Sequence, residues 1–193
     1  MFDGYKITLA SASPRRRQLL EGLGVKFSVE PNKDEKEAYS PNLPCDKVSE
    51  FLAVHKSETF HRPLEDKEIL ISADTLVFLD GELMGKPKDR EEALDMIARL
   101  SGHTHQVYTG VALRTNRTLV SFTDRTDVTF RQMSRAEIEY YVDTFKPYDK
   151  AGAYGVQEWI GYSSITEIRG SYFNVMGLPV HRVYESLKSL TQG

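Results

Sequence analysis

Residues 6–24 read KITLASASPRRRQLLEGLG, and this stretch gives the first indication of the fold class because it joins a predicted strand to a predicted helix. Residues 6–10 are apolar enough for a buried strand. Ser13 suits a helix N-cap, because its hydroxyl can accept a hydrogen bond from a free backbone N–H. Pro14 suits the first helical position, where no N–H is needed, and Gly24 suits a C-terminal cap. The stretch therefore predicts a strand that runs directly into a short helix.

The same alternation of strands and helices continues along the chain. Asp80-Gly81 is a strong signal for a hairpin turn. Pairs three residues apart resemble capping boxes that open helices at Asp89 and Ser134, and two further helices are predicted from Asp46 and from about Pro179. Predicted strands cover residues 26–29, 68–72, 76–79, 106–114, 118–130, 163–168 and 172–175. This order predicts a mixed α/β fold.

Length and composition limit the class of protein. A chain of 193 residues suits one domain, residues 1–193, and the net charge of −3 provides no general attraction for nucleic acid. Cys45 is the only cysteine, so no internal disulfide can form. No apolar run approaches ~20 residues, and we expect neither a transmembrane helix nor a secretory signal. We therefore expect a soluble, cytoplasmic protein that binds neither nucleic acid nor membrane.

Three arginines stand where the helix dipole disfavours them. Arg15, Arg16 and Arg17 occupy the first turn of the predicted helix, where acidic residues are usual. Free backbone N–H groups at a helix start bind anions, and arginine adds multidentate donors for phosphate oxygens. The hydroxyls of Ser11 and Ser13 would add to such a site. The stretch is either a polyphosphate site or a solvated basic face, and local physics does not choose between them.

Other polar residues have similar double interpretations. Asp74, in the sequence SADT after a buried apolar run, could act as a general base or bind Mg²⁺, although an Asp-Thr pair more often caps a turn. Lys56 and Lys86 could each meet a phosphate or simply be solvated. Gln157 ends the small-residue run DKAGAYGVQ and carries the amide needed to read a base edge. His103 and His105 lack a third ligand nearby, so zinc is not expected.

Six stretches in order resemble a known family. LASASPRR, ISADT, LMGKP, LSGHTHQVYTGVAL, DKAGAYGVQ and GSYFNVMGLP together resemble the Maf family of nucleoside triphosphate pyrophosphatases, over residues 7–187. AGAYGVQ and GSYFNVMGLP are similar to its dTTP/UTP-directed branch. The resemblance implies a fold related to inosine-triphosphate pyrophosphatase, with a long twisted mixed β-sheet, flanking helices and a cleft between two lobes. It also implies Mg²⁺ or Mn²⁺ as cofactor, and homodimers are common in the family.

The resemblance assigns roles residue by residue. Asp74 matches the proton acceptor and, with Glu35, the metal side of the site, although the alignment around Glu35 has few anchors. Residues matching substrate-binding positions are Ser11, Arg15, Arg16, Lys56, Thr75, Lys86 and Gln157. Arg17 matches no such position and should be solvated. After Gln157 the family often continues with small residues, whereas Glu158 and Trp159 follow here.

The implied reaction is hydrolysis of dTTP and UTP, and of modified pyrimidine triphosphates, to the nucleoside monophosphate and pyrophosphate. Cations and a metal would neutralise the phosphates, and Asp74 would activate water for attack at the α-phosphorus. The implied role is cleaning of the nucleotide pool. A non-catalytic nucleotide-binding regulator of cell division remains the alternative from another class. A nucleic-acid-binding protein that uses the arginine cluster is disfavoured by the net charge.

Overall fold

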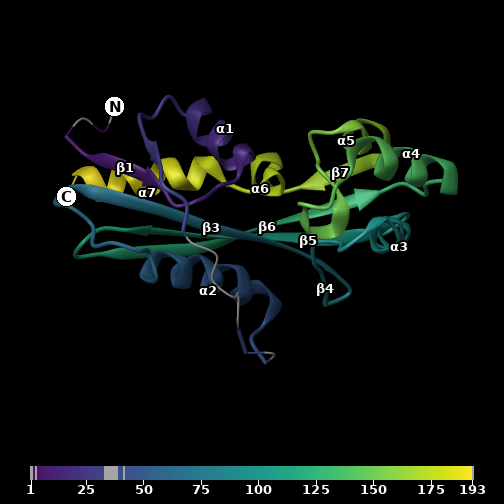
Figure 1. Cartoon of the computed structure of the whole chain (residues 1–193), viewed down its shortest axis with the longest axis horizontal. Coiled ribbons are helices and arrows are strands. Elements are labelled where there is room, and N and C mark those ends of the chain that lie inside the picture. The colour runs from purple at the N-terminus through teal and green to yellow at the C-terminus, as the bar shows by residue number, and fades with distance from the viewer. Residues whose placement is uncertain (1, 3, 33–38, 41, 193) are drawn as a thin grey trace. The chain divides into compact units, whose positions relative to one another are not determined.

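Strands and helices alternate along the chain, as the sequence predicts (Figure 1). The computed structural model describes residues 2, 4–32, 39–40 and 42–192. Its strands are β1 (Lys6–Leu9), β2 (Ser28–Val29), β3 (Glu68–Leu79), β4 (Glu82–Met84), β5 (Thr104–Arg114), β6 (Leu119–Phe130) and β7 (Ile165–Arg169). Its helices are α1 (Pro14–Gly22), α2 (Cys45–Glu58), α3 (Arg90–Leu100), α4 (Arg135–Phe145), the 3₁₀ turn η1 (Ala151–Ala153), α5 (Trp159–Ser164), α6 (Tyr172–Met176) and α7 (Val180–Gln192).

The strands form one mixed sheet of seven strands. Its order is β2-β1-β3-β5-β6-β7, and β4 pairs with β3 off this path. β1 runs parallel to both β2 and β3, whereas β4 and β7 run antiparallel to their neighbours. The predicted mixed sheet with flanking helices is confirmed.

The chain divides into two compact units. The first contains Met1–Asp74, Thr109–Asp124 and Gly177–Gly193, and the second contains Thr75–Tyr108 and Arg125–Met176. Each unit is therefore assembled from separate stretches of the chain. The single domain over residues 1–193 and the cleft between two lobes stay predictions.

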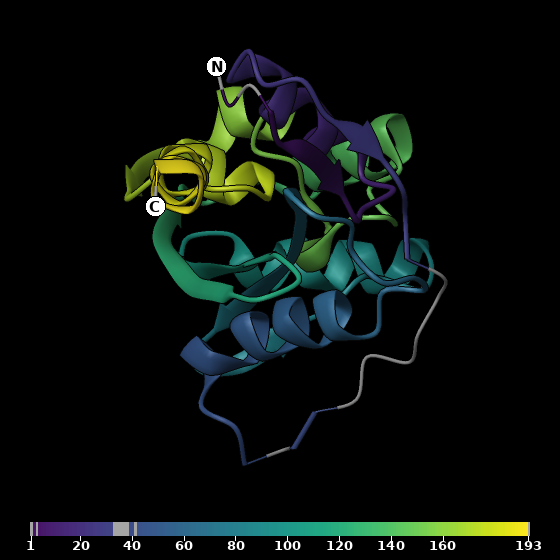
Figure 2. The ribbon, with the colours of Figure 1, turned by 90° about the vertical axis from the view of Figure 1, so that its left-hand side faces the viewer.

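In the first unit, helices cover both faces of its part of the sheet. α2 lies on one face, and α1 and α7 lie on the other (Figures 1 and 2). α2 turns Val48, Leu52 and Ala53 inward, and all three are buried. The helix comes very close to β5 at Gly110, where an added Cβ would lie 2.1 Å from the Ser49 carbonyl group. The fit between α2 and the sheet therefore depends on a missing side chain at one position.

In the second unit, local signals fix the start of the helices and a hairpin. Ser134 and Glu137 form the full capping box predicted for α4. The Asp89 side chain caps α3 as expected, but the Glu92 carboxylate accepts from Lys88 rather than from Asp89. The Asp80-Gly81 turn joins β3 to β4 with both residues in the left-handed region, which suits a two-residue hairpin.

Several predicted elements are wrong. Residues 68–72 and 76–79 belong to one continuous strand, β3, so Asp74 lies inside a strand and not in a turn after it. Residues 172–175 form helix α6 and not a strand, because the Ser171 hydroxyl caps its first turn through the backbone N–H of Asn174. α2 begins after Pro44, and Asp46 lies in its first turn without being the N-cap.

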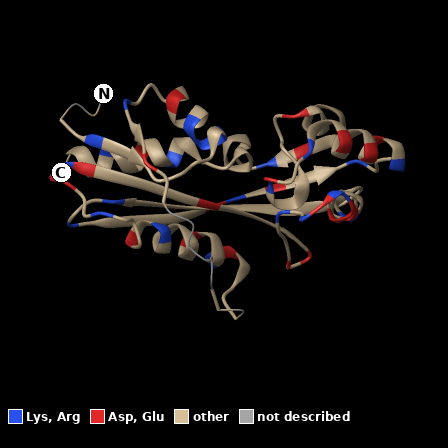
Figure 3. Ribbon diagram, viewed as in Figure 1, with Lys and Arg blue, Asp and Glu red and all other residues tan. Residues whose placement is uncertain are grey.

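The helices carry charges of both signs, and none of the described helices is suited to span a membrane. α1, α2, α3, α4 and α7 each carry both acidic and basic residues, and Figure 3 shows the two signs interspersed. Within the described part of the chain, every helix is too short or too polar to cross a membrane.

Candidate active site

Asp74 lies in the middle of β3 and is almost completely buried. Its relative exposure is 6 %, and the neighbouring strand residues Ser72 and Ala73 are also buried. The Ser72 hydroxyl donates to the backbone carbonyl of Ala53 in α2 at 2.7 Å, which ties this part of the strand to the helix. A carboxylate in such a position is rigidly held, and its burial requires a compensating charge.

Lys56 supplies that charge from the last turn of α2. Its Nζ lies 2.5 Å from Asp74 Oδ1, and the two side chains are 23 % and 9 % exposed. Lys56 follows Ala53 by three residues and Leu52 by four, so its stem lies on the buried face of the helix. The interpretation of Lys56 as a merely solvated lysine is wrong, because its ammonium turns inward to the carboxylate.

The arginine cluster separates into residues with different environments. Arg16 is half-buried, and its guanidinium donates to the carbonyl oxygen of Gly177 at 2.9 Å and to Ser11 Oγ at 3.4 Å. Arg15 is also half-buried. Arg17 is exposed and forms an ion pair with Glu21 one turn later, at 2.9 Å. The expectation that Arg17 is a surface residue is confirmed, and Arg16 joins α1 to the segment before α7.

Three further site residues predicted from the sequence lie in the second unit. Thr75 is half-buried in β3, and Lys86 is exposed after β4. Gln157 is half-buried, and among the described residues its Oε1 has no hydrogen-bond partner. The structure thus pairs Lys56 with Asp74 and Ser11 with Arg16. The meeting of these residues with Thr75, Lys86 and Gln157 at one ligand stays a prediction.

Comparison with known proteins now adds the family. Residues 6–190 match the family model described as Maf-like protein. The chain belongs to the Maf family. It is 48% identical over 188 residues to a dTTP/UTP pyrophosphatase of Bacteroides thetaiotaomicron, with 97% of each chain covered. It is also 48% identical over 186 residues to a dTTP/UTP pyrophosphatase of Porphyromonas gingivalis, with 95% of this chain and 94% of that one covered.

Solved structures give a weaker likeness. A HAM1 protein from Coxiella burnetii aligns over 97% of both chains with 13% identity and a TM-score of 0.46.

A metal, expected from the Maf resemblance, would find few ligands among the described residues. They contain no group of three or more His, Cys, Asp or Glu side chains able to hold an ion. Glu35, the second expected ligand, lies outside the described residues. Mg²⁺ usually binds one or two carboxylates together with substrate phosphates. Asp74 is one carboxylate of the kind that Mg²⁺ binds, and its role in holding a metal stays a prediction.

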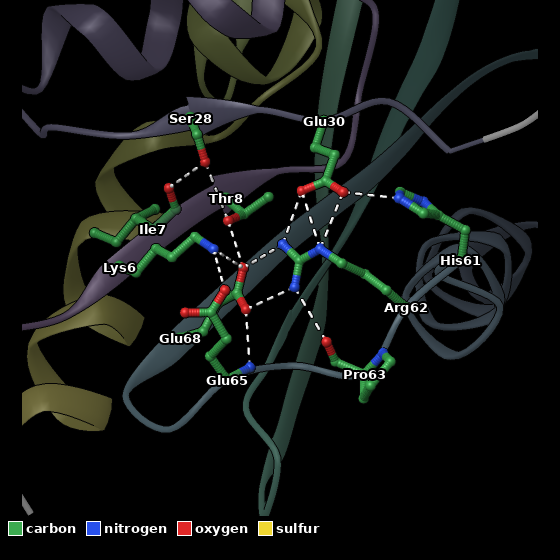
Figure 4. A network of polar contacts seen from close by, with 10 residues as sticks. All are labelled: Lys6, Ile7, Thr8, Ser28, Glu30, His61, Arg62, Pro63, Glu65 and Glu68. Carbon is green, nitrogen blue, oxygen red and sulfur yellow. Dashed lines mark hydrogen bonds and ion pairs between the residues drawn. The ribbon is translucent and has the colours of Figure 1, made fainter.

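Two polar clusters in this Maf protein escaped the sequence analysis. In the first unit, Arg62 binds the carboxylates of Glu30 and Glu68, each at 2.7 Å, and Glu68 also accepts from Thr8 (Figure 4). Hydrogen bonds from Arg62 lower the pKa of Glu68 to about 2. In the second unit, Tyr141 and Glu158 form another cluster. Neither cluster was predicted, because partners distant in sequence leave no local signal. A buried tyrosine hydroxyl usually has a hydrogen-bond partner, and this was the one available hint.

Proposed function

We propose that this Maf protein hydrolyses dTTP and UTP between the α- and β-phosphates, releasing the nucleoside monophosphate and pyrophosphate. The names of its relatives support this substrate class, at 48% identity over nearly the whole chain. The observation that carries the proposal in the structure is the pairing of half-buried Lys56 with buried Asp74, with 2.5 Å between Nζ and Oδ1. Modified pyrimidine triphosphates would be hydrolysed as well, and the role in the cytoplasm would be cleaning of the nucleotide pool.

In the proposed mechanism, Asp74 takes a proton from the water that attacks the α-phosphorus. The new P–O bond forms as the bond from the α-phosphorus to the bridging oxygen breaks, and pyrophosphate leaves. A substrate with about four negative charges is hydrolysed mainly through positioning and neutralisation of charge. Lys56 fixes the Asp74 carboxylate, and Arg15, Arg16 and Lys86 supply further positive charge with hydroxyls from Ser11 and Thr75.

A divalent cation completes the proposed site. Asp74, together with Glu35, would hold Mg²⁺ or Mn²⁺, which neutralises negative charge on the phosphates when it is bound. A homodimer is also proposed, from the family resemblance alone.

The test is a panel of nucleoside triphosphates with Mg²⁺, scored for release of pyrophosphate. We expect dTTP and UTP to be the preferred substrates of the wild-type protein. Asp74→Asn keeps the shape of the side chain but cannot accept the proton, so turnover should fall by at least about 10³-fold while nucleotide binding persists. Near-normal turnover in this variant would remove Asp74 from its role. Binding of dTTP without any pyrophosphate release by the wild type would leave only a regulator.

A further inference from the structure

Gln157 occupies the third position of a tight turn that begins at Gly155. The backbone N–H of Glu158 donates to the carbonyl oxygen of Gly155 at 3.0 Å, which closes a four-residue turn. A second such hydrogen bond follows directly, from the N–H of Gly161 to the carbonyl oxygen of Glu158 at 2.9 Å. The direction of the Gln157 side chain therefore depends on how firmly this one turn is held.

The phenol of Tyr141, on the buried face of α4, holds the turn from the inside. Its oxygen accepts a hydrogen bond from the N–H of Gly155 at 3.0 Å, and its O–H donates to the carboxylate of Glu158. Together with the bond between Glu158 and Gly155, these contacts make a closed ring of three hydrogen bonds. Burial and the neighbouring carboxylate raise the pKa of Tyr141, so the phenol stays a donor at every physiological pH.

The Glu158 carboxylate is also held by a cation and by close packing. Lys150 Nζ lies 3.1 Å from Glu158 Oε1, with side chains 10 % and 18 % exposed. The carboxylate lies over Gly155 so closely that a Cβ at that position would come within 2.8 Å of Cδ. Glu158 thus turns back onto the turn that precedes it and is not a solvated residue at its edge.

From this geometry we infer that Glu158 and Tyr141 are positioning residues that fix the Gln157 amide for recognition of the base. The inference rests on the proposed function. Thymine and uracil present an N–H donor between two carbonyl acceptors, and the Gln157 Oε1 has no hydrogen-bond partner within the described residues. A glutamine amide turned over would match cytosine equally well. A turn held by three hydrogen bonds therefore provides selectivity that the glutamine alone does not.

The experiment compares kcat and KM for dTTP, UTP and CTP in four variants. Glu158→Ala and Tyr141→Phe should each lower the preference for dTTP over CTP, measured as the ratio of kcat/KM values, by about tenfold. The change should come from a higher KM for dTTP, with kcat kept within about twofold. Glu158→Gln retains an acceptor for Tyr141 and should restore most of the preference. Tyr140→Phe, a neighbour on α4 whose ring packs on Trp159, is the matched control and should behave like the wild type.

A merely structural role would give a different result. Loss of folded protein would lower kcat for all three nucleotides in proportion and leave KM and the preference unchanged, and that result would overturn the inference. Calorimetric binding of non-hydrolysable α,β-methylene analogues of dTTP and CTP makes the same comparison without turnover. If the wild type bound selectively but released no pyrophosphate, the proposed function would fail alone. If Glu158→Ala left the binding preference intact, the inference would fail alone.

Discussion

Arg16 and Arg17 are adjacent in the sequence but have different surroundings. Arg16 donates to the Gly177 carbonyl oxygen and to Ser11 Oγ, whereas Arg17 pairs with Glu21 at the surface. Exposed ion pairs contribute little to stability. We therefore expect Arg17→Gln to change the rate of pyrophosphate release by less than about twofold. Arg16→Gln should lower it by more than about tenfold and reduce the free energy of unfolding by about 1–3 kcal/mol.

Steady-state kinetics and urea unfolding of the two arginine variants check this prediction. The same substitution at neighbouring positions serves as its own control for loss of a positive charge. Equal losses of activity in both variants would mean that the cluster acts through its total charge, and the division between Arg16 and Arg17 would be wrong.

Individual residues were predictable from sequence where their partners are local. The caps at Ser13, Asp89 and Ser134 were found because a helix start is encoded within four residues. The surroundings of Lys56 could not be predicted in this way. Its partner Asp74 is 18 residues away, and the two residues meet only when α2 packs on β3. The sequence predicted both Lys56 and Asp74 as site residues, but only the fold shows that they form a pair.

The close approach of α2 to β5 predicts that the sheet cannot accept a side chain at Gly110. A methyl group at position 110 would lie 2.1–2.2 Å from backbone atoms of Ser49 and Glu50, which cannot move aside as a side chain can. Gly110→Ala should therefore lower the free energy of unfolding by at least about 2 kcal/mol, measured by urea denaturation. Gly22→Ala is the matched control. Nothing lies within 4 Å of its added Cβ, so this helical residue should gain about 0.5–1 kcal/mol.

Equal stability of Gly110→Ala and the wild type would show that α2 can shift on the sheet. That outcome would also weaken the argument that α2 places Lys56 rigidly against Asp74.

The ends of helices and strands were predicted correctly where turn residues mark them. Predictions failed where tertiary contacts determine the secondary structure. The hairpin at Asp80-Gly81 was found because its backbone conformation demands such residues. Tyr172–Met176 resembles a strand in composition but forms a helix, and Asn174 inside it is fully buried and donates to Val107 and Thr126. Val107 and Thr126 lie on β5 and β6, far from Asn174 in the sequence, so no local pattern could reveal these contacts.

Across the whole molecule, a buried histidine and two ion-paired glutamates predict how stability depends on pH. Burial lowers the pKa of His105 to about 4, below the ordinary value of about 6.5, and its ring contacts the hydroxyl of Tyr154. Hydrogen bonds from Arg62 lower the pKa of Glu68 to about 2, and those from Arg131 do the same for Glu137. In both cases the unfolded chain binds protons that the folded chain does not.

The stability should therefore fall in two stages as the pH is lowered. Between about pH 6.5 and 4, the unfolded chain binds a proton at position 105 while the buried imidazole stays neutral. Below about pH 4.5, unfolded Glu68 and Glu137 become protonated while their folded forms remain ionised, and this loss continues to about pH 2. Urea unfolding from pH 7.5 to 2 measures both stages. His105→Gln should remove the first fall in the free energy of unfolding. Glu68→Gln should remove only part of the second fall, because Glu137 still contributes there. A first stage unchanged in His105→Gln would show that the buried imidazole does not cause it, because only a group with different folded and unfolded pKa values produces a slope.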